Sequence, residues 1–192
     1  MINPRKITDF NRTDGQLEEF LLFAIFVAGK RSDVTAKKLN ELLTLINGRA
    51  RAFEAIRQAT AEGTLLESLM AVKMGKYNML MEGLPALAAS GVDLRACSPA
   101  ELEKFKGIGL KSSRFFILHS RDNARVSALD THILSWLREK GYNAPSSTPT
   151  SARRYEKLED LFLFEADQAK MKPSVFDLEI WKSRQVRKKA QV

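Results

Sequence analysis

Lys111 has the residue type and the sequence setting that covalent chemistry would need. It comes two residues after the second glycine of Gly107-Ile108-Gly109 and falls in the first turn of a predicted helix. A cation at that place opposes the helix macrodipole, which favours the neutral amine. A neutral lysine amine can attack an electrophilic carbon, such as C1′ of a deoxyribose, and form a Schiff base. We therefore predict that Lys111 is a nucleophile.

Asp130 is the natural partner for such a nucleophile. It lies nineteen residues after Lys111 and directly precedes an apolar helix that contains Ile133, Leu134 and Trp136. At the N-cap position the helix would hold the carboxylate in place. Capping alone would explain an aspartate here, and that role is compatible with a catalytic one. We expect Asp130 to assist the departure of a leaving group.

The residues around Lys111 predict a helix-hairpin-helix over about residues 98–122. Ser98-Pro99-Ala100-Glu101 has the N-cap, the proline and the capping-box glutamate that begin a helix. Gly107 and Gly109 flank one apolar residue and allow the turn into the second helix. The open N-terminus of that helix suits a phosphate, and three cations surround it: Lys106, Lys111 and Arg114. The hairpin is therefore predicted to bind a nucleic-acid backbone.

With these motifs, the stretch 102–136 resembles the helix-hairpin-helix, Gly/Pro-Asp (HhH-GPD) superfamily of DNA glycosylases. The shared pattern is apolar, Gly, apolar, Gly, any residue, Lys, and then an apolar-Asp-x-His. The resemblance implies that Lys111 is the Schiff-base nucleophile of a bifunctional glycosylase/lyase and that Asp130 is the family aspartate. The Gly/Pro-rich loop that names the family reads Arg125-Val126-Ser127-Ala128-Leu129 here. The path into Asp130 therefore departs from the family pattern.

The resemblance also implies a function and a set of DNA contacts. It is greatest with the compact 8-oxoguanine glycosylases, which act as monomers on double-stranded DNA, flip out a damaged base, excise it and cut the strand by β-elimination. No cofactor or catalytic metal is required, but a Na⁺ or K⁺ can bind to backbone carbonyls, here within 105–110. The expected contacts to the DNA backbone are Lys106, Gly107, Gly109, Arg114 and His132.

Two further segments are candidates for contact with the flipped base or the gap it leaves. Lys30 and Arg31 follow the first core helix, at the junction where the family places a wedge side chain; a solvated basic turn would look the same. The segment 176–181 resembles the closing helix of the short 8-oxoguanine glycosylases. Phe176 or Trp181 could therefore stack on the base, although most large aromatic residues belong to cores.

The elements that must position these residues are all predicted to be helices. The apolar residues recur at helical spacing and nowhere alternate as in strands. We expect one all-α, two-lobed unit over residues 1–192, with a helix that Pro85 breaks and a basic tail over 182–192. Beyond the hairpin, helices are expected at about 17–28, 33–47, 50–61, 65–72, 79–90, 92–96, 131–140, 151–170 and 173–181.

Composition narrows the class of partner. The formal net charge of +8 indicates an anionic partner, although charge alone fits RNA or a membrane surface equally well. No apolar run reaches membrane-spanning length and residues 1–14 lack a signal-peptide pattern, so we expect a soluble intracellular protein, cytoplasmic and nucleoid-associated or nuclear. Cys97 is the only cysteine, which excludes a disulfide and the iron–sulfur cluster of the endonuclease III branch.

Three questions stay open on sequence alone. A noncatalytic helix-hairpin-helix module would have the same hairpin, and a helical scaffold could use the basic surface for RNA or protein partners. Within the enzyme class, the closing segment favours oxidised guanine. Oxidised or deaminated pyrimidines, alkylated purines and hypermodified bases are the alternatives.

Overall fold

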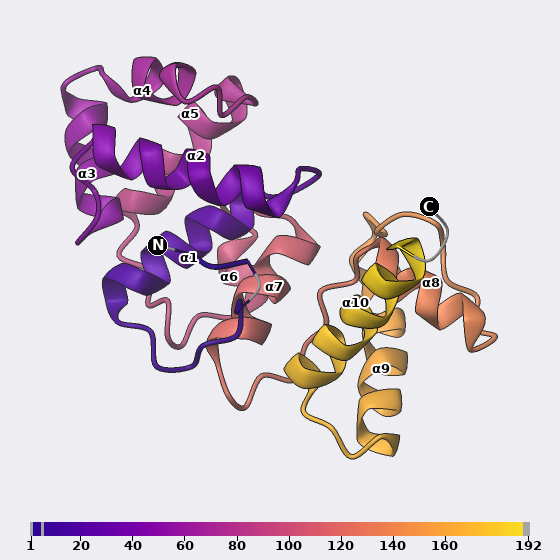
Figure 1. Ribbon diagram of the computed structural model, residues 1–192. Helices are drawn as coiled ribbons and strands as arrows, with labels where there is room; N and C mark the ends of the chain where they lie inside the picture. The colour runs from indigo at the N-terminus through magenta and orange to yellow at the C-terminus, as the bar shows by residue number, and fades with distance from the viewer. Residues whose placement is uncertain (1, 5, 190–192) are drawn as a thin grey trace.

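The fold consists of helices joined by short turns. The computed structural model describes residues 2–4 and 6–189, with side chains through Arg184, and contains no strand within these residues. Figure 1 shows the helices in two groups along the chain. Their bounds are α1 (Asp14–Phe26), α2 (Ser32–Leu45), α3 (Ala52–Ala61), α4 (Leu65–Ala71), α5 (Tyr77–Ala89), α6 (Pro99–Leu102), α7 (Leu110–Ser120), α8 (Thr131–Glu139), α9 (Ala152–Gln168) and α10 (Pro173–Lys189).

The first lobe comprises α1 to α7 around α1. Every residue of α1 from Leu17 to Phe26 is buried, as the nearly all-round apolar sequence predicts. A capping box between Thr13 and Gln16 begins this helix. Helices α2, α3 and α7 pack directly against it. A single apolar core therefore joins the N-terminal helices to the hairpin that carries Lys111.

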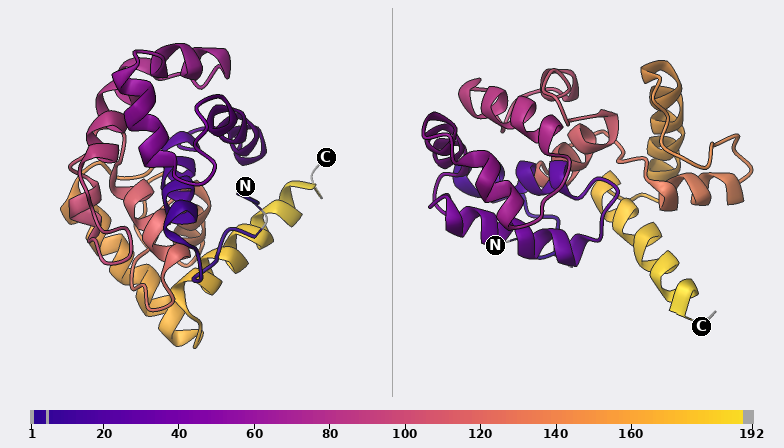
Figure 2. Two further views of the ribbon diagram at one scale, coloured as in Figure 1. Left: turned by 90° about the vertical axis from the view of Figure 1, so that its left-hand side faces the viewer. Right: turned by 90° about the horizontal axis from the view of Figure 1, so that it is seen from above.

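The second lobe comprises α8, α9 and α10. It has its own apolar core, which includes Leu134, Tyr155 and Phe162. Helix α10 packs on α8 and α9 and also contacts α7, so it bridges the two lobes. Figure 2 shows α10 extending past the rest of the second lobe. None of the described helices combines the length and the apolar character that a membrane crossing needs.

Two expectations about helices are wrong, namely the break at Pro85 and the helix at 92–96. Helix α5 continues through Pro85 to Ala89 because Leu84 and Leu87 bury its C-terminal half in the core, which outweighs the lost hydrogen bond. The expected helix at 92–96 forms only a turn, in which Cys97 N donates to Asp93 O at 2.8 Å. These differences leave the order of the other elements unchanged.

The helix-hairpin-helix forms as predicted. Ser98 caps α6 with Glu101 in a capping box, and Gly107 turns the chain at a φ of 93°. The hairpin rests on α5 at Gly83, where an added Cβ would lie 2.0 Å from the carbonyl oxygen of Lys106. Only glycine permits so close an approach, so α5 sets the depth at which the hairpin lies.

Candidate functional site

A cleft of about 1330 Å³ brings together six segments that are distant in sequence, the first of which is the N-terminal segment with Pro4 and Ile7. The first lobe contributes the turn after α1, residues 27–32, and the hairpin with the start of α7, residues 107–112. The second lobe contributes residues 128–132, residues 147–150 and the first half of α10. Figure 1 shows the two lobes that contribute these segments. Both predicted catalytic residues line the cleft.

Lys111 lies in the first turn of α7 and is partly buried. Its Nζ lies 5.8 Å from the centroid of the Phe115 ring, one helical turn further along α7. Among the described residues, no carboxylate lies within 4.0 Å of this ammonium. The amine is therefore not engaged in an ion pair with any side chain that the structure describes.

Asp130 is the N-cap of α8, as predicted. Its Oδ1 accepts hydrogen bonds from the backbone N–H groups of His132 at 2.8 Å and Ile133 at 2.9 Å. These two bonds fix the orientation of the carboxylate. The second oxygen, Oδ2, is not used in capping. A negative oxygen is thus held at the wall of the cleft that contains Lys111.

The path into Asp130 is fixed by side chains from α9 and the preceding loop. Glu159 Oε1 accepts from Ser127 N at 2.7 Å. The buried Tyr155 hydroxyl donates to Ser127 O at 2.8 Å and accepts from Leu129 N at 2.9 Å. Thr148 Oγ1 donates to Leu129 O at 2.7 Å. These hydrogen bonds fix the backbone of residues 127–129, the segment that contains no Gly or Pro where the resemblance implies a Gly/Pro-rich loop.

Two faces of different helices meet at the inner end of the cleft. On α7, Lys111, Phe115 and His119 follow one another at intervals of four residues and therefore lie on one face of the helix. On α10, Asp177 and Trp181 are also four residues apart and share a face. His119 is fully buried, and its Nδ1 shares a hydrogen bond of 2.8 Å with Thr8 Oγ1. Its Nε2 lies 3.5 Å from Asp177 Oδ2 and has no hydrogen-bond partner among the residues that the structure describes. The inner end therefore pairs a carboxylate with an unsatisfied ring nitrogen.

No protein-family model matches the chain. Two solved structures are similar to it throughout. A Methanocaldococcus jannaschii 8-oxoguanine glycosylase/lyase in complex with a 15mer DNA containing 8-oxoguanine has 21% sequence identity and a TM-score of 0.68, covering 94% of this chain and 88% of that one. The M. jannaschii 8-oxoguanine DNA glycosylase has 21% identity and a TM-score of 0.65, with coverages of 94% and 83%. This chain shares their fold. The similarity confirms the all-α, two-lobed HhH-GPD fold that the hairpin predicted.

Arg114 does not have the predicted role of a DNA-backbone contact. It is buried, and its guanidinium bonds Glu103 Oε1 at 2.6 Å and Glu159 Oε1 at 3.1 Å. Burial would lower the pKa of Arg114, but the charge and hydrogen bond of Glu159 raise it above the usual value. Both carboxylates hold the side chain inside the protein. Arg114 instead ties the hairpin helix to α9.

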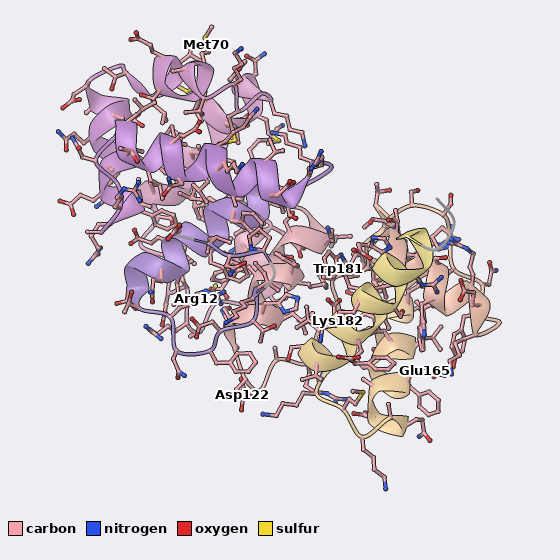
Figure 3. All side chains as sticks on the ribbon, viewed as in Figure 1. Arg12, Met70, Asp122, Glu165, Trp181 and Lys182 are labelled. Carbon is pink, nitrogen blue, oxygen red and sulfur yellow. The ribbon has the colours of Figure 1, made fainter. Side chains whose placement is uncertain are left out.

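Phe176 is also wrong as a base-pocket residue. It is 8% exposed, and its ring packs at 5.2 Å from Trp136 and 5.3 Å from Phe162 in the core of the second lobe. Trp181 lies in the cleft instead. Figure 3 shows Trp181 and Lys182 on the side of α10 that faces the first lobe. Of the two aromatic residues predicted for the base pocket, α10 therefore brings only Trp181 into the cleft.

The other residues predicted to contact DNA differ in whether they line the cleft. Gly107, Gly109 and His132 line the cleft. Lys30 and Arg31 line it from the first lobe, although the guanidinium of Arg31 pairs with Asp33 at 2.8 Å. Lys106 lies outside the cleft, exposed on the hairpin, with its Nζ 3.8 Å from Glu82. Most of the predicted backbone contacts are therefore accessible, and how they meet DNA remains a prediction.

Sequence reasoning missed His119 and Asp177 as cleft residues. Neither residue belongs to a possible metal site, because the described residues contain no cluster of three metal-binding side chains. The spacing of four residues from Lys111 to Phe115 and on to His119 was the available signal. Most of the basic tail predicted at 182–192 lies beyond Arg184, the last residue whose side chain is described.

Proposed function

We propose that this protein is a bifunctional DNA glycosylase and AP lyase that removes a damaged base from double-stranded DNA, with 8-oxoguanine as the first candidate. One observation carries the proposal. Lys111 and Asp130 line the same cleft, in a fold shared with an 8-oxoguanine glycosylase/lyase. A lysine without an ion-pair partner and an oriented carboxylate are the groups that displacement at a sugar carbon requires.

The chemistry follows from these two groups. With the nucleotide extruded into the cleft, Lys111 Nζ attacks C1′ and the bond from C1′ to the base breaks. Asp130 stabilises the positive charge that develops on the sugar, and the base leaves with a proton. Ring opening gives a Schiff base between C1′ and Nζ. Loss of a proton from C2′ then breaks the C3′–O bond on the 3′ side, and water releases the lysine.

The cleft offers a place for the extruded base between α7 and α10. Eight residues separate Lys111 from His119, which corresponds to about 12 Å along a helix. A base whose sugar lies beside Lys111 would therefore pass the Phe115 ring and point its far edge at His119 and Asp177. Asp177 can accept hydrogen bonds from ring or amino N–H groups, and Trp181 offers a stacking surface. These four residues form the proposed base pocket.

The hairpin supplies the proposed DNA anchor. Gly109, where an added Cβ would meet no atom within 4 Å, leaves room for a phosphate at the start of α7, where the helix dipole and Lys106 favour an anion. Among the described residues, no hydrogen bond reaches the carbonyls of Gly107 and Ile108. We propose these two carbonyls as ligands for the Na⁺ or K⁺ expected at 105–110, whose charge would attract the same phosphate.

Borohydride trapping tests the proposal, using duplexes that each carry one lesion. The 8-oxoguanine duplex should give a covalent protein–DNA adduct, and Lys111→Gln should abolish it. Lys104→Gln is the matched control, since it removes a lysine from an exposed position of the same hairpin that does not line the cleft, and it should keep the adduct.

The outcomes separate the parts of the proposal. Absence of an adduct and of alkali-labile sites with every lesion would overturn the glycosylase assignment and favour a noncatalytic DNA-binding module. Alkali-labile sites without an adduct would remove only the Schiff-base step. An adduct with a different lesion would change the substrate and keep the mechanism.

A further inference from the structure

Three lysines meet where the turn after α1 lies against the turn before α5. Lys30 Nζ donates to Met74 O, and Lys38 Nζ donates to Lys73 O. Lys76 Nζ reaches in the opposite direction and donates to Ala28 O at 2.9 Å. We call Lys30, Lys38 and Lys76 the lysine cluster. Lys30 and Lys76 join the two turns through backbone carbonyls, and Lys38 joins α2 to the turn before α5.

The lysine cluster has no neutralising carboxylate. Among the described residues, none of its ammonium groups lies within 4.0 Å of an acidic side chain, and the nearby Asp33 is paired with Arg31. Burial and the charges of Lys76 and Lys38 lower the pKa of Lys30, so both neighbouring cations lie close enough to act on it. Like charges gathered without a counter-charge favour the binding of an anion.

The geometry leaves the ammonium groups able to bind such an anion. Each ammonium carries three N–H donors, and each described bond to a carbonyl uses one of them. Those bonds also limit where the side chains can point. Lys73 and Lys76 have left-handed backbones, with φ of 52° and 56°, a conformation that costs free energy in residues other than glycine. The turn is therefore held in a costly shape that keeps the cluster together.

The lysine cluster lies at the rim of the cleft. Ala28 and Lys30 line the cleft from the first lobe, and the hairpin residues Gly107 and Gly109 line it at a separate place. Figure 1 shows the turn between α1 and α2 on the side of the first lobe that faces the second lobe. A polyanion lying across the cleft could therefore touch the hairpin and the lysine cluster together.

We propose that the lysine cluster is a second binding site for the DNA backbone, which holds phosphates of the duplex while the hairpin holds others. This inference rests on the proposed function for its partner, double-stranded DNA. Two anchors fix the direction of the duplex across the cleft, whereas the hairpin alone would leave it free to pivot. The cluster therefore acts in binding and takes no part in bond breaking.

The salt dependence of DNA binding tests this site. The double variant Lys38→Gln/Lys76→Gln keeps side chains that can donate to the carbonyls but loses two charges. The affinity for a lesion-free duplex is measured over a series of salt concentrations, where each neutralised phosphate contributes about 0.9 to the slope of log K against log[salt]. We expect the slope to fall by about 1 to 2 in magnitude.

Two matched variants serve as controls. Lys157→Gln/Lys170→Gln removes the same charge from exposed positions in α9 and the turn after it, which do not line the cleft, and should leave the slope near that of the wild type. Lys38→Arg/Lys76→Arg keeps both charges and should restore the slope. Melting temperatures of all variants establish that each is folded.

The outcomes distinguish this site from the proposed enzyme activity. An unchanged slope in Lys38→Gln/Lys76→Gln, or an equal fall in the α9 control, would overturn the second anchor while leaving borohydride trapping unaffected. A specific fall in slope without any trapping would keep the anchor and remove the enzyme. Failure of the wild-type protein to bind duplex DNA would overturn the anchor as well.

Discussion

The chain segments that bring Lys111 and Asp130 into the cleft are held in different ways. The hairpin before Lys111 is built from neighbouring residues, with a capping box between Ser98 and Glu101 and a turn at Gly107. The segment before Asp130 has no such local signals and depends on side chains that follow much later in the chain, chiefly Tyr155 and Glu159. One catalytic candidate is thus placed by local structure and the other by tertiary contacts.

This difference has a consequence for function. The proposed phosphate site at the hairpin should depend less on the second lobe, because the hairpin turn rests on α5 and Ile108 belongs to the core of the first lobe. The Asp130 carboxylate reaches its position only when α9 is docked, since Glu159 bonds both Ser127 and Arg114. Damage to the α9 contacts should therefore reduce base removal more than DNA binding. Four substitutions test whether base removal and DNA binding depend on different contacts.

Replacement of Glu159 should have the largest effect. Glu159→Gln leaves the buried Arg114 guanidinium with one carboxylate, Glu103, and should cost about 3 kcal/mol in the free energy of unfolding. Urea denaturation measures this cost. Asp167→Asn, which breaks the exposed pair with Arg125, is the control and should leave the free energy of unfolding nearly unchanged. Equal costs for the two variants would show that the buried pair does not hold α9 in place.

Gly83→Ala tests the close packing of the hairpin against α5. The added Cβ would lie 2.0 Å from the Lys106 carbonyl oxygen, so the hairpin must move, at a cost of up to about 3 kcal/mol. The affinity for lesion-free DNA should fall with it. Gly109→Ala meets no atom within 4 Å and should leave the unfolding free energy nearly unchanged. A stable Gly83→Ala protein with full DNA affinity would contradict the close approach.

These two sites also show what sequence could and could not predict. The capping box, Gly107 and the N-cap Asp130 were predicted because their partners lie within a few residues. Arg114 was misassigned because one of its two carboxylates lies 45 residues away, so it resembled a free cation. Spacing along α10 could not distinguish Phe176, which faces the second core, from Trp181, which faces the cleft.

Tyr155→Phe removes a single hydroxyl from the Asp130 side. It leaves Ser127 O and Leu129 N without their buried partner, which should cost about 2 kcal/mol. Single-turnover base release should slow while the affinity for lesion-free DNA stays the same. Tyr142→Phe is the control, because that hydroxyl bonds Glu165 at a partly exposed site away from the cleft. Equal loss of DNA binding and base release in Tyr155→Phe would show that the two functions do not depend on different contacts.

Ser98→Ala should have the smallest effect. It removes the capping box that begins α6 and should cost about 1 kcal/mol in the free energy of unfolding. DNA affinity should weaken slightly, and the rate of base release from bound DNA should be unchanged. A change in that rate larger than the change in affinity would show that the hairpin also positions the reacting groups.

The central claim is that Lys111 and Asp130 act on one sugar in one cleft. Single-turnover base release by the wild-type protein, Lys111→Gln, Asp130→Asn and the double variant tests it most directly, on the duplex that gives the borohydride adduct. Groups that act in one step lose their effects together, so the double variant should be about as slow as the slower single variant. Effects that multiply in the double variant, or full activity in either single variant, would contradict the account.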